Sequence, residues 1–206
     1  MDELQTQRLL IRPFTAADVA TAHQVLDLEM QWDGDNVSRQ ERAQILQREI
    51  LLANWHDGSR LFGARGIFLH ATGQLIGVCG FSPWLWTPEQ KALFWPYVLD
   101  TTAAPDEYGH ASFELSILYG LSPKQRGQGY ATEAAGRLIA YAFETLQVKC
   151  VFANTNRSNV GSINVMKRAG MRVAVHPTRP DEEWPDGPAV VGCIENPQQH
   201  GLGGDA

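Results

Sequence analysis

The sequence predicts a mixed α/β (α+β) fold, built as a single domain over residues 1–195 and followed by a flexible tail over residues 196–206. Three observations support this prediction. Strand-like apolar runs alternate with helical segments, a hairpin pattern occupies residues 62–81, and an apolar stripe marks a helix over residues 131–146. The chain has 206 residues, of which 44% are hydrophobic and 19% charged, so it can bury a sizeable core.

The first part of the chain is predicted to form a strand, two helices and a hairpin. Pro13 ends the strand, because proline does not suit a strand interior. Thr15, followed three residues later by Asp18, is typical of a helix start. The expected elements are the strand 9–12, the helices 15–28 and 38–55, and the hairpin strands 62–69 and 75–81.

Residues 82–111 form a Trp- and Pro-rich segment of weak periodicity, which predicts a long loop inserted before the next strand. The tryptophans argue against disorder. Two compatible interpretations stay open. The segment is either an ordered flap that packs on the core, or a wall of a substrate site to which Trp84, Trp86 and Trp95 contribute.

The second half repeats the alternation of strands and helices. Ala134, Leu138 and Ala142 belong to a stripe that recurs at steps of three and four residues, as in an amphipathic helix. Gly170 is typical of a left-handed helix C-terminus. The expected elements are the strand 113–121, the loop 123–129, the helix 131–146, the strand 148–153, the helix 159–169 and the strands 171–175 and 189–194, the last two joined by a Pro/Asp/Glu-rich loop.

The charge and residue usage disfavour several classes of protein. A net charge of −6 argues against a protein that grips a nucleic-acid backbone. No run approaches the ~20 apolar residues of a membrane span, and the first residues lack the pattern of a secretory signal. The six histidines are scattered without metal-ligand spacing, so we expect no metal. Cys79, Cys150 and Cys193 lie far apart in apolar runs and predict buried, reduced thiols in a cytoplasmic protein.

The glycine-rich stretch Gln125-Arg126-Gly127-Gln128-Gly129-Tyr130-Ala131-Thr132 lies between a predicted strand and the predicted amphipathic helix. A helix N-terminus carries free N–H groups and the positive end of the helix dipole. Glycines there let the backbone approach an anion, and Arg126 adds a charge suited to phosphate. The stretch therefore predicts a diphosphate cradle, although the two glycines could instead simply form a tight turn.

Two other phosphate-binding motifs fit this stretch less well. A Walker loop requires Gly-Lys-Ser/Thr, which is absent. The dinucleotide fingerprint requires a third glycine where this chain has Thr132, and an acidic residue after the next strand, which reads Val151-Phe152-Ala153-Asn154.

Three segments of the chain resemble signatures of the GNAT N-acetyltransferase superfamily, and the resemblance covers roughly residues 5–195. Residues 125–134 resemble its acetyl-CoA loop. Residues 6–13 resemble the opening of the RimJ/RimL-like branch, and residues 159–171 resemble the second signature of that branch. The resemblance implies a GNAT-like mixed, mostly antiparallel central sheet flanked by helices, in which the strands before and after the loop helix splay apart to admit pantetheine. Two departures, the length of the segment 82–111 and a central strand that is longer by about two residues, fall beside the expected amine site.

The resemblance implies acetyl-CoA as co-substrate, with no metal, and direct attack of an amine on the thioester. For cofactor binding it implies Leu121, Gln125, Arg126, Gly127, Gln128, Gly129, Tyr130, Ala131, Asn159 and Ser162. Asn159 and Ser162 have an alternative explanation, because such residues often cap helices. Ser162 and Tyr119 are candidate proton donors.

Glu114 is the candidate general base, acting directly or through water. It shares one face of its strand with Ser116 and Leu118. The alternative is a salt-bridged or edge-exposed glutamate. Trp84, Trp86 and Glu114 are the candidate substrate contacts.

The predicted function is an N-acetyltransferase that acts on a protein N-terminus, a peptide or a small amine. The alternatives are a non-catalytic acyl-CoA-binding module and a nucleotide-binding protein. The expected partner is an amine-bearing small molecule or a peptide N-terminus, without nucleic acid or membrane, and a homodimer is one option for assembly.

Overall fold

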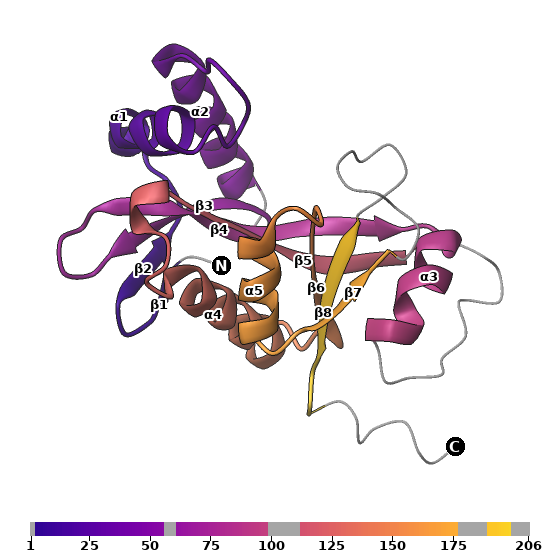
Figure 1. The fold of residues 1–206 in the computed structure, drawn as a ribbon. Helices are drawn as coiled ribbons and strands as arrows, with labels where there is room; N and C mark the ends of the chain where they lie inside the picture. Colours follow the sequence, from indigo (N-terminus) through magenta and orange to yellow (C-terminus); the bar gives the residue numbers. More distant parts are fainter. Residues whose placement is uncertain (1–2, 56–60, 99–111, 177–188, 199–206) are drawn as a thin grey trace. The chain divides into compact units, whose positions relative to one another are not determined.

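A computed structural model of the protein describes residues 3–55, 61–98, 112–176 and 189–198 (Figure 1). Their eight strands form one sheet in the order β1-β2-β3-β4-β5-β6-β8-β7. β5 and β6 pair in parallel, whereas β1–β2, β2–β3, β3–β4, β6–β8 and β7–β8 are antiparallel. The strands are β1 Leu4–Gln5, β2 Leu9–Arg12, β3 Gly63–Leu69, β4 Leu75–Trp86, β5 Ser112–Leu121, β6 Cys150–Thr155, β7 Arg172–Val175 and β8 Val190–Glu195. The predicted mixed, mostly antiparallel sheet is confirmed.

Apart from the short turn η3, which lies in the predicted loop 123–129, the helical elements agree with the predicted ones to within a few residues, with two exceptions. They are η1 Ala16–Asp18, α1 Val19–Ala22, η2 His23–Glu29, α2 Arg39–Trp55, α3 Pro88–Val98, η3 Pro123–Gln125, α4 Tyr130–Glu144 and α5 Val160–Arg168. The first exception is the helix predicted over residues 15–28, which consists of a 3₁₀ turn, one α-turn and a π-helical segment. The second exception is α3, which lies inside the segment predicted to be a loop.

The chain divides into two compact units. Unit 1 comprises residues 1–82 and 118–138, and unit 2 comprises residues 83–117 and 139–206. The prediction of one domain over residues 1–195 stays a prediction. Residues 199–206 of the predicted tail and the Pro/Asp/Glu-rich loop over 177–188 lie outside the described residues.

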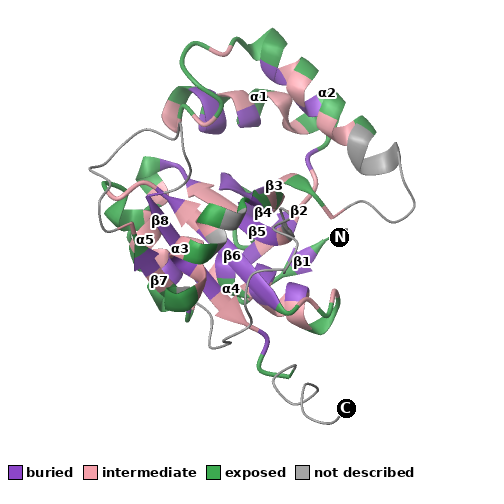
Figure 2. Ribbon diagram, turned by 90° about the vertical axis from the view of Figure 1, so that its right-hand side faces the viewer, coloured by how far each residue is buried: buried purple, intermediate pink, exposed green. Residues whose placement is uncertain are grey.

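In unit 1, the helices α1 and α2 lie side by side (Figure 1), and their buried side chains pack with those of β3 and β4. Figure 2 shows the buried residues concentrated on the strands and on one side of these helices. Each such apolar side chain contributes about 1.5–3 kcal/mol of hydrophobic stabilisation. The cluster comprises Phe14, Ala22, Val25, Leu26, Leu46, Phe68, Leu75 and Val78.

A buried ion cluster connects η2 to α2. The side chains of Arg42 and Asp27 are 2% and 1% exposed, and they form two hydrogen bonds, one of them from Nε to Oδ2 at 3.0 Å. His23 Nδ1 lies 3.0 Å from Asp27 Oδ2, and Arg42 Nη2 lies 2.6 Å from Oδ2 of the more exposed Asp33. Burial raises the pKa of Asp27, but hydrogen bonds from Arg42 and His23 outweigh it and hold this pKa below its usual value.

Unit 2 is built around an aromatic cluster. The helices α3 and α5 both contact β7 and β8. Trp86 and Phe94 are buried with Phe152, and the rings of Trp86 and Phe152 have centroids 5.2 Å apart. The prediction of a loop beginning at residue 82 was therefore wrong for residues 82–98, which complete β4 and form α3. Pro96 inside α3 and the exposed Tyr97 hide the helical pattern, so packing rather than local periodicity explains this helix. Residues 99–111 lie outside the described residues.

The ion cluster gives a prediction for two matched substitutions. Asp27→Asn leaves the buried Arg42 with a weakened partner, and we expect it to lower the free energy of unfolding by about 3 kcal/mol. Asp33→Asn removes a partner that is 40% exposed, and we expect a loss below about 1 kcal/mol. Urea unfolding of the two variants measures both losses, and equal losses would contradict the central role of Asp27.

The same pair of residues predicts a pH dependence. Because folding lowers the pKa of Asp27, its stabilisation is complete above the unfolded pKa and is lost as the pH falls through the folded one. The difference in unfolding free energy between the wild type and Asp27→Asn should therefore shrink below about pH 4.

Candidate active site

The connection between β5 and α4 begins with a self-contained turn in unit 1. Ser122 is 2% exposed, and its carbonyl accepts the N–H of Gln125 at 2.9 Å. The N–H of Arg126 donates to the carbonyl of Pro123 at 3.4 Å. The 3₁₀ turn η3 thus uses the N–H group of Arg126, and the N–H groups without an acceptor begin at Gly127.

The two glycines of this loop both adopt left-handed backbone conformations. Gly127 has a φ of 78° and Gly129 a φ of 82°. A Cβ added to Gly127 would have no atom within 4 Å, and one added to Gly129 would lie 3.4 Å from an Arg8 nitrogen. Conformation rather than crowding therefore explains why the loop uses glycine at these two positions.

The backbone N–H groups that follow Arg126 in the loop have no hydrogen-bond acceptor within the described part of the chain. The first N–H of α4 with a partner in the helix belongs to Glu133 and donates to the carbonyl of Gly129 at 3.0 Å. Among the described residues, nothing accepts a hydrogen bond from the N–H groups of residues 127–130. Residues 126–129 are exposed, and Gly129 has no side chain with which to cap the helix. The loop thus presents several donors at the positive end of a helix dipole.

The side chains of the loop leave a positive charge beside these amides. Arg126 donates from Nε to the carbonyl of Leu121 at 3.2 Å, and no carboxylate pairs with it among the described residues. Gln128 and Gln125 bond to each other, with Nε2 3.2 Å from Oε1. An exposed anion at this place would meet both backbone donors and a guanidinium.

The end of β5 that leads into the loop is tightly packed. A Cβ on Gly120 would lie 2.5 Å from the ring of Trp32 and 2.9 Å from the Met30 side chain. The predicted site residues Tyr119 and Leu121 flank this glycine, and Leu121 is buried. In unit 1, the end of β5, the loop after it and the start of α4 thus contain the predicted site residues Tyr119, Leu121 and 125–131.

The other predicted site residues lie in unit 2. Oε2 of Glu114 accepts a hydrogen bond from the Cys150 thiol at 3.7 Å, a contact that the sequence did not predict. Asn159 caps α5, because its Oδ1 accepts the N–H of Ser162 at 3.1 Å. The capping role left open by the sequence is confirmed for Asn159, and the roles of Glu114 and Ser162 in catalysis stay predictions.

The tryptophans predicted to contact substrate belong to the aromatic cluster. Trp86 is 2% exposed, and its indole N–H has no acceptor in the part of the chain that the structure describes. The rings of Trp84 and Trp86 have centroids 6.4 Å apart. The sequence leaves two interpretations of this segment open, a packed flap and a wall of the substrate site. The burial of Trp86 supports the packed flap at this residue.

The family model for the acetyltransferase (GNAT) domain matches residues 8–172, which is most of the chain. This chain belongs to the GNAT acetyltransferase family. The matched range includes the glycine loop and helix α4, and the match agrees with the resemblance seen in the sequence.

Two curated relatives of this GNAT chain match over part of their length. The uncharacterized N-acetyltransferase YnaD of Bacillus subtilis is 31% identical over 65 residues, which cover 32% of this chain and 37% of the relative. The FsC-acetyl coenzyme A-N(2)-transacetylase of Aspergillus fumigatus is 35% identical over 97 residues, which cover 46% of this chain and 40% of the relative. The matched regions thus span less than half the length of both relatives.

Two solved structures share the GNAT fold over nearly the whole chain. A putative ribosomal-protein-serine acetyltransferase from Vibrio cholerae is 22% identical with a TM-score of 0.64, over 95% of this chain and 99% of that one. The ribosomal L7/L12 α-N-protein acetyltransferase RimL, solved with coenzyme A, is 16% identical with a TM-score of 0.62, over 94% and 98%. These likenesses show that the chain shares its fold with these two proteins.

Two groups of residues that support the GNAT loop were not predicted. Glu29 accepts hydrogen bonds from the Ser122 hydroxyl and from Lys124 Nζ, the latter at 2.6 Å. Arg8 and Glu133, which form the second group, stand in two of the segments that carry the resemblance. Both residues belong to segments that resemble family signatures. Their pairing is a tertiary contact between distant residues, so no local sequence pattern predicts it.

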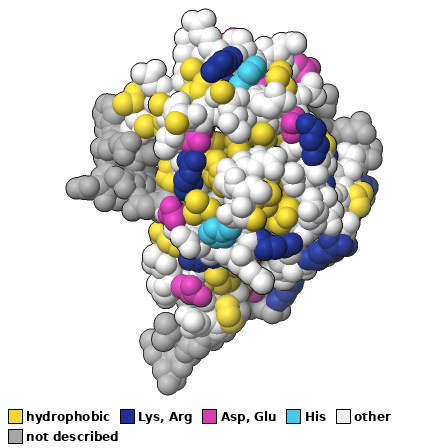
Figure 3. All heavy atoms as spheres, turned by 90° about the vertical axis from the view of Figure 1, so that its left-hand side faces the viewer, with side chains coloured by type: hydrophobic (Ala, Val, Ile, Leu, Met, Phe, Trp, Pro, Cys, Tyr) yellow, Lys and Arg dark blue, Asp and Glu magenta, His cyan; other side chains and the backbone are white. Residues whose placement is uncertain are grey.

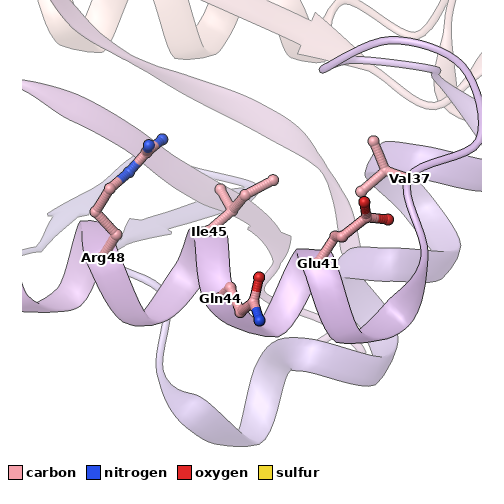
Figure 4. Close-up of a pocket in the computed structure, with 5 residues that line it drawn as sticks. All are labelled: Val37, Glu41, Gln44, Ile45 and Arg48. Carbon is pink, nitrogen blue, oxygen red and sulfur yellow. The ribbon is translucent and has the colours of Figure 1, made fainter.

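A separate hollow lies along α2 and shares no residue with the loop (Figure 4). It has a volume of about 370 Å³ and is lined by Val37, Glu41, Gln44, Ile45 and Arg48. The N–H of Ser38 donates to Glu41 at 2.8 Å, so this carboxylate already serves the start of α2. We assign no role to the hollow.

The surface carries both signs of charge. On the face drawn in Figure 3, Lys and Arg side chains lie at several separate places, with acidic and apolar side chains between them. Within the described ranges, no three His, Cys, Asp or Glu side chains gather in a way that could hold a metal ion. No helix among those residues combines the length and apolar character that a membrane crossing requires.

A glycine of the loop and a glycine of helix α4 predict opposite effects for alanine substitutions. Gly127→Ala forces a Cβ into a left-handed conformation, and we expect a loss of about 1–2 kcal/mol in the free energy of unfolding. Gly136→Ala, at an exposed position inside α4 with nothing within 4 Å of the new Cβ, should gain up to about 1 kcal/mol. Thermal unfolding measures both, and a neutral Gly127→Ala would show that the loop does not require its positive φ.

Proposed function

We propose that this protein is an acetyl-CoA-dependent N-acetyltransferase that transfers the acetyl group to a primary amine by direct attack of the amine on the thioester. One observation carries the proposal. Among the described residues, nothing accepts a hydrogen bond from the N–H groups of residues 127–130, which lie at the start of α4 beside two left-handed glycines, and residues 127–129 are exposed.

These residues fit the diphosphate of coenzyme A. A diphosphate carries acceptor oxygens for several N–H groups at once and interacts favourably with a helix N-terminus. Arg126 supplies a charge that no described carboxylate neutralises. The cofactor contributes an acetyl group activated as a thioester, and the loop would hold its diphosphate end. Leu121, Gln125, Tyr130, Ala131, Asn159 and Ser162 are proposed as further contacts.

The acceptor is proposed to be a protein N-terminus, a peptide or a small amine. The names of similar proteins support an amine acceptor, since they include an N(2)-transacetylase and acetyltransferases of ribosomal proteins. The three buried free cysteines are compatible with a reducing compartment such as the cytoplasm. A homodimer stays an option for the assembly.

Catalytic roles are proposed for three residues of the chain. Glu114 is the proposed general base, because amines are mostly protonated at neutral pH and need a group that takes their proton. Its carboxylate accepts a weak hydrogen bond from the Cys150 thiol, and a carboxylate can accept several hydrogen bonds at once. Tyr119 and Ser162 are proposed proton donors to the departing thiolate. Trp84 and Trp86 are proposed to shape the acceptor site.

Acetyl-CoA binding and turnover test the proposal directly. Acetyl-CoA at a hundred times its Kd should stabilise the protein by about 2.7 kcal/mol, which raises Tm by roughly 5–10 °C, whereas NAD and ATP should not. Thiol release from acetyl-CoA should appear with at least one member of a panel of N-terminal peptides, polyamines, aminoglycosides and amino acids.

The alternatives predict different results in the same experiment. Stabilisation without thiol release from any amine would identify a non-catalytic acyl-CoA-binding module. Stabilisation by NAD or ATP instead would identify a nucleotide-binding protein. Gly129→Val should weaken acetyl-CoA binding in a folded protein, and unchanged affinity would refute the assignment of the loop.

The proposed base predicts a second kinetic result. Glu114→Gln should lower kcat by about 10²–10⁴-fold and remove the rise of kcat with pH, with little change in KM for acetyl-CoA. Cys150→Ala keeps the carboxylate and loses only the thiol contact, so it should retain most of the activity. A Glu114→Gln enzyme with the wild-type pH profile would exclude this glutamate as the base.

A further inference from the structure

A charged cluster in unit 1 connects the turn between β1 and β2 to the glycine loop. Arg8 donates from Nε to Glu133 Oε2 at 2.6 Å, and its Nη2 also lies 2.6 Å from that oxygen. Its Nη1 donates to the backbone carbonyl of Gln128 at 3.0 Å. The guanidinium carbon lies 4.5 Å from the centre of the Tyr130 ring. One side chain thus contacts three successive parts of the loop and its helix.

Glu133 is held by more than this ion pair. Its Oε1 accepts hydrogen bonds from the Thr6 hydroxyl at 2.5 Å and from the Arg8 N–H at 3.0 Å. Burial raises the pKa of Glu133, but the hydrogen bonds from Thr6 and Arg8 outweigh it, so the pKa lies below its usual value and the group stays charged. A carboxylate with both oxygens engaged fixes the guanidinium in place, unlike a mobile surface pair.

The contact with Gln128 determines the direction of an anion-binding amide. The carbonyl of Gln128 and the N–H of Gly129 belong to one planar trans peptide and point in opposite directions. When Arg8 holds the carbonyl on one side, the N–H of Gly129 must point to the other side. This peptide is followed by a glycine, whose backbone offers little resistance to rotation, so an external contact is needed to fix it.

The cluster also removes an unfavourable charge. Glu133 stands in the first turn of α4, where a second negative charge would repel a bound diphosphate. Arg8 neutralises this carboxylate by forming an ion pair with it. The loop therefore keeps the positive character that its amides and Arg126 provide.

We propose that Arg8 is a positioning residue for coenzyme A binding, which holds the Gln128 carbonyl so that the Gly129 amide faces the diphosphate and which neutralises Glu133 beside it. This inference rests on the proposed function. It assigns to the turn between β1 and β2 a part in the affinity for the cofactor, although Arg8 itself need not touch the cofactor.

Arg12 provides a matched control for this proposal. It lies on β2, pairs with a carboxylate at 2.8 Å (Asp18), and stacks on an aromatic ring at 3.9 Å (Phe68), but it does not contact the loop. Arg8→Met and Arg12→Met therefore lose the same kinds of contact in different places. Arg8→Lys keeps the charge without the forked geometry.

The experiment measures the Kd and KM for acetyl-CoA, kcat, and the backbone NMR order parameters of residues 127–130 in the ligand-free protein. Arg8→Met should raise Kd and KM by about ten- to a hundredfold, with kcat within about twofold, and should lower the order parameters of the loop. Arg8→Lys should show an intermediate loss of affinity and gives the same test if Arg8→Met does not fold. Arg12→Met should leave all four quantities near the wild-type values.

Two outcomes would overturn the proposal. Equal affinities of the Arg8 and Arg12 variants would show that the cluster does not serve cofactor binding. Unchanged order parameters in the loop of Arg8→Met would show that the arginine does not hold the peptide. A wild-type protein that binds no acetyl-CoA would instead refute the proposed function, and the comparison of order parameters would still decide whether Arg8 orders the loop.

Discussion

The loop and helix α4 depend on one constraint, which is that this helix begins without a side-chain cap. A helix start normally receives an oxygen from Ser, Thr, Asp or Asn, and the loss of such a cap costs about 1 kcal/mol. Here Gly129 occupies that place, and the N–H groups of residues 127–130 have no acceptor among the described residues. The fold tolerates a weakly satisfied helix end, which is the condition under which an external anion can bind there.

The supports of the loop follow from this constraint. Glycines with positive φ can expose the amides, but they also make the backbone easy to distort. Unit 1 compensates by fixing the segment before and after them: Glu29 holds Ser122 and Lys124, while Arg8 holds Gln128 and Glu133. The anchors come from two distant parts of the chain, so the loop is only as well ordered as the tertiary structure of unit 1.

Local signals account for what the sequence could predict. Patterns of neighbouring residues mark the apolar stripe of α4, the hairpin β3–β4 and the glycine loop. The positions of these elements were predicted to within a few residues. Three other elements lack such a local signal. The strand β1 has only two residues, the residues of the π-helical segment do not distinguish it from an α-helix, and α3 contains a proline and has no clear apolar stripe. The candidate site likewise has parts that local sequence patterns predict and parts that they do not. The loop could be read from adjacent residues, whereas the contacts of Glu114 with Cys150 and of Arg8 with Glu133 join residues far apart in the chain.

The π-helical segment His23–Glu29 has a consequence for insertions and deletions. Its wider turn, marked by the bond from Met30 N–H to the carbonyl of Val25 at 3.1 Å, lets Asp27 reach Arg42 while Glu29 reaches Lys124. Removal of one residue would restore ordinary α-helical winding and rotate each following side chain by about 100°. The number of residues in this segment is thus fixed by partners on two other elements, and a homologue that keeps both pairs must keep the extra residue.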